Sequence, residues 1–131
     1  MHTTETARKF VLLGVSSEQA AAFQDAALGR GYELHHYDTL SELGYLGRLR
    51  EFDAAIVHED IEPLSGIELA EYLEKLFQSL PVLLLSEKLE LGLQEDVSLP
   101  TSVINRVTSG LAPLHVLQQV EAALASRAQG I

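Results

Sequence analysis

The chain has 131 residues, of which 47% are hydrophobic, and it contains no cysteine. A chain of this length forms about one domain and can bury a core without disulfides or a bound metal. The absence of cysteine excludes both disulfides and thiolate metal sites. Nine lysines and arginines against nineteen aspartates and glutamates give a formal charge of −10. That charge repels the phosphate backbone of nucleic acids, so we expect no direct binding of DNA or RNA.

No part of the chain approaches the ~18 consecutive apolar residues that a membrane-spanning helix needs. Residues 1–8 are polar and lack the apolar segment of a secretory signal. We therefore expect a cytoplasmic protein that does not insert into membranes. His35 and His36 are neighbours in a predicted strand and so face opposite sides, and the other histidines are scattered. We expect neither a metal site nor a cofactor.

The first part of the chain is predicted to form a strand and then a helix. Residues 9–15 are a short, nearly continuous apolar run, which is typical of a strand covered on both faces in a parallel sheet. Ser16 and Gln19 have the spacing of a capping box, and the alanine-rich segment after them ends at Gly29 and Gly31. This pattern predicts a helix from Ser16 to about residue 28.

The second strand and helix have weaker patterns. Residues 32–37 are brief and rich in β-forming residues, and residues 39–51 carry four leucines at three-residue spacing, enough for one apolar helix face. Gly44 and Gly47 each weaken that helix by roughly 1 kcal/mol relative to alanine. We expect it to be short or irregular.

Three further strands are predicted at residues 54–57, 81–86 and 102–106. A clear amphipathic helix begins at residue 67, and a closing helix spans residues 113–127. The inward residues are predicted to be Ile67, Ala70, Leu73 and Leu76 in the first of these helices and Leu117, Val120 and Leu124 in the second. Between the last two strands, leucines alternate with charges, and at most a short, distorted helix is expected there.

Strands that alternate with helices indicate an open, doubly wound α/β domain, because right-handed crossovers place helices on both faces of a parallel sheet. The ligand crevice of such a domain lies at the carboxyl ends of the strands. No linker, repeat or low-complexity tract divides the chain. We expect one domain over residues 9–127, with terminal tails at 1–8 and 128–131.

Three segments resemble the receiver domain of two-component response regulators, which has a flavodoxin-like fold. They are residues 53–66, the predicted strand at 81–86, and the start of the third helix at 65–69. The order of elements extends the resemblance over nearly all of residues 9–127. It implies a five-stranded parallel sheet with helices on both faces, and a role in signal transduction.

In that family an acidic pair after the first strand holds Mg²⁺, an aspartate ending the third strand takes the phosphoryl group, and a lysine after the fifth strand contacts it. These groups suit a hard cation and a highly charged transferred group. A gapless alignment places Gly14 and Val15 at the acidic pair, His58 at the acceptor, Ser86 at the hydroxyl switch, and either Arg106 or Ser109 at the lysine. If Arg106 matches the lysine, Val103 stands at the family's aromatic switch.

Gly14 and Val15 offer no side-chain oxygen to a metal, and His58 stands where the nucleophilic aspartate belongs. We therefore expect no ordinary aspartyl phosphorylation. A phosphorylated histidine at His58 would need a metal or oxyanion partner, and none is recognisable in the sequence. We expect His58 to be a hydrogen-bonded residue at the end of its strand.

Two alternatives remain open. Asp60 could act as the acceptor if the third strand were longer, with Glu59 and Glu62 as further carboxylates, which would make the chain a divergent receiver that uses Mg²⁺. The crevice formed by Gly14, His58 and Ser86 could instead bind a small molecule.

The hypothesis that we favour is that the chain is a pseudo-receiver. Such a domain is non-catalytic and acts by phosphorylation-independent protein–protein interaction in a signalling pathway. The resemblance implies a docking face on the fourth helix, fifth strand and fifth helix, used for protein partners or for a homodimer. Its candidate residues are Leu89, Leu91, Leu93, Val103, Asn105, Arg106 and Gln118.

Overall fold

The computed structural model describes residues 8–44, 46–59, 66–76, 80–86, 103–108 and 110–129. Strand β1 (Lys9–Leu13) leads into helix α1 (Ser17–Gly29). Ser16 is the N-cap of α1, and its hydroxyl accepts a hydrogen bond from the Gln19 backbone N–H at 3.2 Å. Gly31 has a φ of 76°, a left-handed conformation that suits glycine, so the chain turns there into the next strand.

Strand β2 (Glu33–Tyr37) is followed by two short helices in place of one long one. Helix α2 (Leu40–Leu43) is four residues long, and η1 (Leu46–Glu51) is a 3₁₀ helix. Gly44 ends α2 with a φ of 97°, which no residue with a side chain adopts without strain. The prediction of a short or irregular second helix is therefore confirmed.

The remaining elements follow the predicted order. Strand β3 (Ala54–His58), helix α3 (Gly66–Leu76) and strand β4 (Val82–Ser86) come first, and strand β5 (Val103–Thr108) and helix α5 (Pro113–Gln129) complete the order. The segment expected to hold a short fourth helix lies outside the described residues. Strand β5 continues two residues past its predicted end at Arg106, and α5 continues two residues past the expected domain end at residue 127.

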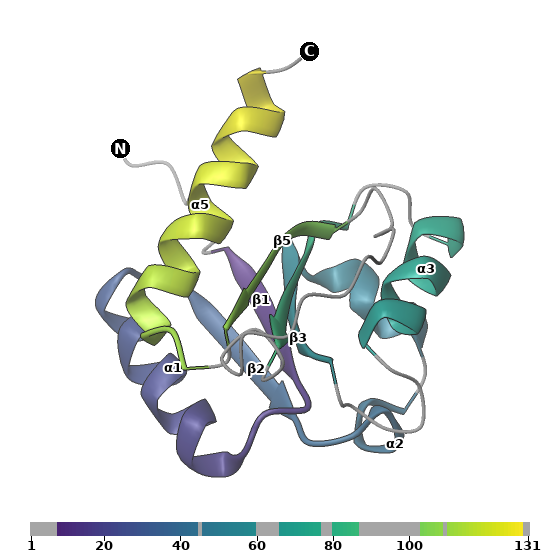
Figure 1. Cartoon of the computed structure of the whole chain (residues 1–131), viewed down its shortest axis with the longest axis horizontal. Coiled ribbons are helices and arrows are strands. Elements are labelled where there is room, and N and C mark those ends of the chain that lie inside the picture. The colour runs from purple at the N-terminus through teal and green to yellow at the C-terminus, as the bar shows by residue number, and fades with distance from the viewer. Residues whose placement is uncertain are drawn as a thin grey trace, which may run out of the picture.

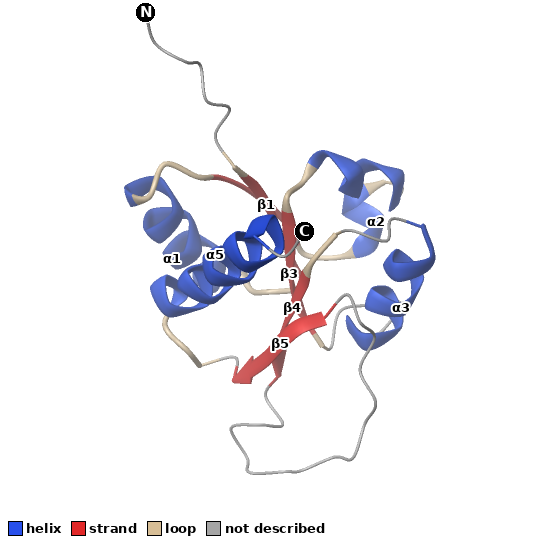
Figure 2. Ribbon diagram, turned by 90° about the horizontal axis from the view of Figure 1, so that it is seen from above, coloured by secondary structure: helices blue, strands red, loops and turns tan. Residues whose placement is uncertain are grey.

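The five strands form one parallel sheet in the order β2-β1-β3-β4-β5. Figures 1 and 2 show α1 and α5 together on one face of this sheet and α2 and α3 on the other. The predicted doubly wound α/β architecture is therefore confirmed.

Two hydrophobic cores lie on the two faces of the sheet, because neighbouring residues of a strand point to opposite sides. The core under α1 and α5 includes Phe10, Ile56 and Leu83, all fully buried. The core under α2 and α3 includes Val11, Val57 and Leu84, also fully buried. Strands that are apolar on both faces are typical of parallel sheets covered by helices.

The inward face of α3 differs in part from the prediction. Leu69, Ala70 and Leu73 are fully buried, whereas Ile67 is only partly buried. Three residues turn an α-helix by about 300°, so a ladder of residues spaced by three drifts around the helix, and Leu69 comes onto the buried face. In α5 the predicted Leu117 and Val120 are fully buried, Leu124 is partly buried, and Val116 joins them.

None of the helices in the described part of the chain is long and apolar enough to cross a membrane.

Candidate functional site at the carboxyl ends of the strands

The carboxyl ends of the parallel strands lie at one edge of the sheet, where α/β domains of this kind bind their ligands. At this edge β1 is followed by Gly14 and Val15, β3 ends at His58, β4 ends at Ser86 and β5 ends at Thr108. Gly14 has a φ of 82°, and its N–H donates to the Tyr37 carbonyl at 3.0 Å. The structure therefore brings Gly14, Val15 and His58, which were predicted as site residues, to the same edge as Ser86.

An ion pair between Glu59 and Arg106 bridges this edge. The Arg106 Nε atom donates to Glu59 Oε2 at 2.5 Å, and its second guanidinium nitrogen donates to Oε1 at 2.8 Å. The two side chains are only 10% and 12% exposed. A bidentate pair with this little solvent contact is geometrically specific and weakly screened. It joins the end of β3 to β5.

Glu59 continues the ladder of β3, because its backbone N–H donates to the Leu85 carbonyl of β4 at 2.9 Å. Strand alternation places it on the same face as Val57, which packs under α2 and α3. Arg106 pairs in register with Leu84, and Thr108 pairs with Ser86. Glu59, Ser86 and Arg106 therefore share one face of the sheet.

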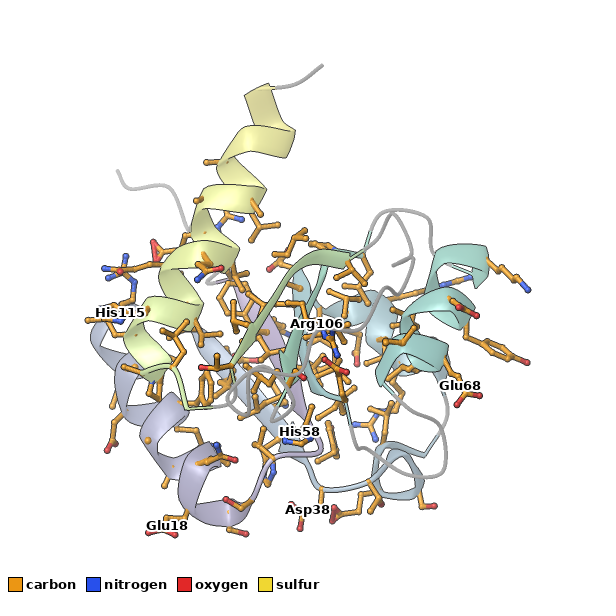
Figure 3. The ribbon with its side chains drawn as sticks, viewed as in Figure 1. Glu18, Asp38, His58, Glu68, Arg106 and His115 are labelled. Carbon is orange, nitrogen blue, oxygen red and sulfur yellow. The ribbon has the colours of Figure 1, made fainter. Side chains whose placement is uncertain are left out.

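His58 has the opposite parity in β3. It follows Ile56 by two residues, and the Ile56 side chain belongs to the core under α1 and α5. His58 is 8% exposed. In Figure 3, His58 and Arg106 lie toward the middle of the molecule, with Glu68 and His115 at its periphery.

Ser86 ends β4 with a fully buried side chain. Its hydroxyl oxygen has no hydrogen-bond partner among the residues that the structure describes. A buried hydroxyl without a partner costs free energy, so such a group is a place where a ligand or water can bind favourably.

His36 occupies the edge beside β1. Its Nε2 atom lies 2.9 Å from the Val15 carbonyl oxygen and 3.0 Å from Asp38 Oδ1. A carbonyl can only accept, so Nε2 carries the proton and donates. His35 lies on the other face, with Nε2 at 2.8 Å from Glu33 Oε2 and its ring against Phe52. The prediction that the two histidines face opposite sides is confirmed.

Within the described ranges no three histidine, aspartate or glutamate side chains are grouped so that they could hold a metal ion. Several predicted site residues lie outside those ranges: Asp60, Leu89, Leu91, Leu93 and Ser109, together with the side chain of Asn105. Of the other interface candidates, Val103 is half-buried against the core under α2 and α3, and Gln118 is exposed on α5.

From the sequence, Glu59 was expected only as a further carboxylate beside Asp60, and Arg106 as a possible lysine equivalent and a candidate residue of the docking face. Their partnership joins residues 47 positions apart. No local pattern reports such a contact, because it depends on the register of β3, β4 and β5. One signal was present in the sequence, namely a single charged residue in the strand, which needs a counter-charge when it is buried.

The sequence matches no family model and no curated protein. The structure is similar to the receiver domain of an HD-domain protein from Pseudomonas fluorescens Pf-5, with a TM-score of 0.75 and 15% identity over 95% of this chain and 99% of that one. It is similar to a CheY-like receiver domain protein from Methanospirillum hungatei JF-1, with a TM-score of 0.74 and 14% identity over 96% of this chain and all of that one. The chain has the receiver fold.

The response regulator DrrB from Thermotoga maritima has a TM-score of 0.70 and 14% identity over 93% of this chain. This chain spans 54% of the length of DrrB. The receiver fold therefore corresponds to about half of that regulator.

Proposed function

We propose that this chain is a pseudo-receiver, a non-catalytic signalling domain of the cytoplasm that acts by phosphorylation-independent binding of a protein partner. The observation that carries the proposal is the bidentate pair between Glu59 and Arg106 at the carboxyl edge of the sheet. A carboxylate after β3 is already neutralised there by a cation of the protein itself.

In a phosphorylated receiver, the phosphoryl group on the third strand is contacted by a cation from the fifth. Glu59 and Arg106 likewise join the end of the third strand to the fifth by opposite charges, but without a transferred group and from a position before the end of β5, and Glu59 lies on the same face as Ser86. Because both side chains belong to the chain itself and are nearly buried, the link does not depend on a transferred group. We infer that the domain is held in one conformation and signals by being bound.

The surroundings of the first strand support the same proposal. Gly14 and Val15 stand at the positions of the acidic pair, and the Val15 carbonyl accepts a hydrogen bond from His36. A cation has less to bind here than in the family's pattern, which needs two carboxylates. The role of Mg²⁺ in phosphoryl transfer, which is to neutralise developing charge, would then have no carboxylate to rely on at these two positions.

The register of β5 bears on the two lysine-equivalent candidates. Arg106 lies opposite Leu84, and Thr108 lies opposite Ser86, the last residue of β4. A residue that follows the end of β5 is Ser109, so this register favours Ser109 at the lysine position. Arg106, three residues earlier, then stands at the position of the aromatic switch, in place of Val103. Its guanidinium group is bound by Glu59.

The proposal is tested by an amide NMR titration of the intact chain with Mg²⁺ and beryllofluoride, which mimics an acyl phosphate. We expect spectra that do not change, for the chain itself and for the Asp60→Ala variant. Saturable, Mg²⁺-dependent shifts at Ser86 and His58 that disappear in Asp60→Ala would overturn the proposal and make Asp60 the acceptor of a divergent receiver.

A second candidate function rests on the Ser86 hydroxyl, which is fully buried and unpartnered in the described part of the chain. A small molecule that accepts or donates a hydrogen bond there would be held at the carboxyl edge. Such a ligand would raise the unfolding temperature with its concentration, because it binds the folded state only. A screen of metabolites by thermal shift, with Ser86→Ala as the matched control, would detect it.

A further inference from the structure

Strand β2 is the end of the described sheet, so one of its edges has no partner strand. Glu33 donates its N–H to the Arg8 carbonyl, and Tyr37 accepts from the Gly14 N–H. Alternate residues of a parallel strand bond to opposite neighbours. The backbone groups of Leu34 and His36 therefore point away from β1, toward the open edge.

A groove of about 400 Å³ lies beside this edge, between the second half of α1 and β2. Its apolar lining includes Ala27, Leu28, Tyr32 and Leu34. Leu28 is 78% exposed, the highest value among the large hydrophobic side chains of the described residues. An apolar groove next to unpaired backbone groups is the arrangement that strand addition uses, in which main-chain bonds give affinity and a pocket selects a side chain.

One lining residue of the groove, Tyr32, packs against the core under α1 and α5. The Tyr32 ring lies against Phe10 with 4.8 Å between ring centroids. Burial, the larger cause, and a hydrogen bond with Glu121 raise the pKa of the Tyr32 hydroxyl. The groove is thus formed before anything binds, which lowers the ordering cost of binding.

The charge of the groove is one-sided. Asp25 and Glu33 line it, and none of its lining residues is basic. Arg30, the nearest cation in the sequence, is held instead by Glu121 through a bidentate pair, with one contact at 2.6 Å. A net charge of −10 on the whole chain adds to the same sign.

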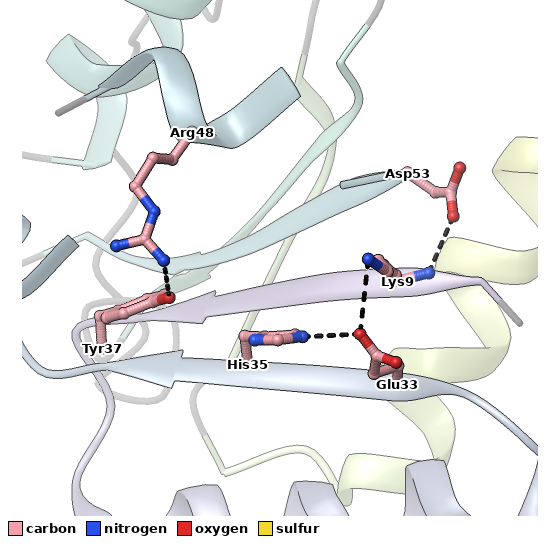
Figure 4. A network of polar contacts seen from close by, with 6 residues as sticks. All are labelled: Lys9, Glu33, His35, Tyr37, Arg48 and Asp53. Atoms are coloured by element: carbon pink, nitrogen blue, oxygen red, sulfur yellow. Dashed lines mark hydrogen bonds and ion pairs between the residues drawn. The ribbon is translucent and has the colours of Figure 1, made fainter. Parts of the chain in front are cut away.

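The two carboxylates are not equivalent. Figure 4 shows Glu33 between Lys9 and His35, at 3.7 Å from the Lys9 ammonium and 2.8 Å from the imidazole. Asp25 has no hydrogen bond or ion pair among the described residues. Asp25 is therefore the carboxylate of the groove that is left for a cation of a partner.

We propose that the open edge of β2 and the groove beside it bind an extended segment of a partner protein in which an aliphatic or aromatic residue is flanked by lysine or arginine. The segment adds to β2 through the backbone of Leu34 and His36, its apolar side chain packs on Leu28, and its basic side chain meets Asp25. This assignment rests on the proposed function, because it locates the binding surface of a domain that acts by protein interaction.

The test begins with panning a phage-displayed random nonapeptide library against the intact chain. Enriched peptides are expected to carry a large apolar residue next to a lysine or arginine. Their affinity should fall at least about tenfold for Leu28→Ser and for Asp25→Lys. Leu114→Ser removes another exposed leucine on α5, and Glu71→Lys makes the same charge change on α3, so both control variants should bind as the parent chain does.

Amide exchange then distinguishes strand addition from side-chain contact alone. Binding of an enriched peptide should slow the exchange of the Leu34 and His36 N–H groups by at least about tenfold, because these groups would donate to the added strand. The proposal is overturned by panning that enriches nothing, by peptides without a basic residue, by equal binding to Leu28→Ser, or by unchanged exchange at both amides.

The beryllofluoride titration is independent of these outcomes. If beryllofluoride leaves the spectra unchanged and no peptide binds, the proposed peptide site is wrong and the pseudo-receiver proposal stands. If peptides bind and beryllofluoride causes Mg²⁺-dependent shifts, the peptide site stands and the pseudo-receiver proposal is wrong.

Discussion

Arg106 of β5 donates two hydrogen bonds to the carboxylate of Glu59, at 2.5 Å and 2.8 Å. The Arg106 and Glu59 side chains are only 12% and 10% exposed. Removal of one member of such a pair leaves an uncompensated charge out of water, which costs more than the pair itself contributes. The pair is thus a structural necessity once either residue is present, whatever its role in signalling.

Substitution of Arg106 by methionine should therefore lower the free energy of unfolding by about 3–5 kcal/mol. The double variant Glu59→Gln with Arg106→Met should lose less than the sum of the two single variants, because no charge is left unpaired. Urea unfolding at neutral pH measures both. A single variant within about 0.5 kcal/mol of the parent chain would show that solvent screens the pair in solution.

Gly44 determines where helix α2 ends. Its φ of 97° forces the chain out of α2, and a side chain there would be strained. Gly44→Ala should cost about 1–3 kcal/mol.

Gly29 is the matched control, because it ends α1 without a positive φ and nothing lies within 4 Å of the position of an added Cβ. Gly29→Ala should be neutral or stabilise the chain by up to about 1 kcal/mol. Thermal unfolding of the two variants compares them. Equal effects would mean that the turn at Gly44 relaxes.

Substitutions at Leu69 and Tyr72 test which side of α3 is buried. Leu69 is fully buried, and Tyr72 is 54% exposed. Leu69→Ala leaves a cavity in the core under α2 and α3 and should cost about 2–5 kcal/mol. Tyr72→Ala should stay within about 0.5 kcal/mol. Chemical denaturation of both variants checks the orientation of the helix, and a larger loss at Tyr72 would contradict it.

Glu121 makes part of the stability depend on pH. A hydrogen bond from Arg30, the largest cause, holds the pKa of the Glu121 carboxyl below its ordinary value of 4.5 in the folded chain. The unfolded chain then takes up the proton first as the pH falls, so the contribution is complete above pH 4.5 and is lost as the pH drops through the lowered pKa.

The stability difference between the parent chain and Glu121→Gln should accordingly be constant from neutral pH down to the ordinary pKa of the carboxyl and shrink below it. Unfolding in urea at several pH values measures this difference. Arg30→Gln removes the other partner and should remove the same pH-dependent part. A difference that grows toward acid would contradict the assignment.

Most elements of the fold could be predicted because they rest on local patterns. The run from Lys9, the Ser16 cap and the glycines after Leu28 each act through neighbours in the sequence, and β1 and α1 formed where expected. The second helix was expected to be weak for a local reason as well, the two glycines. The predicted buried face of α3 was partly wrong, because residues spaced by three drift around the helix, so that Leu69 replaces Ile67 among the fully buried residues.

The candidate site, like the fold, could be predicted only in part from the sequence. Which residue types stand at the ends of the strands is a property of the sequence: it puts no acid at Gly14 or Val15 and a histidine at residue 58. Whether His58 or Glu59 shares a face with Ser86 depends on strand parity and register, and these are set by the pairing of β3 with β4 and of β4 with β5. A shift of one residue in either strand exchanges the two faces.

The sequence by itself thus determined the order of strands and helices, the acidity, and the chemical character of each strand end, because these depend on composition and on periodicity within a few residues. Only the tertiary structure decided that Arg106 finds Glu59 across 47 positions. It alone also leaves the edge of β2 beside Leu28 without a partner strand among the described residues. Both depend on which strands become neighbours, and that is decided by burying two apolar faces at once, a condition on the whole chain.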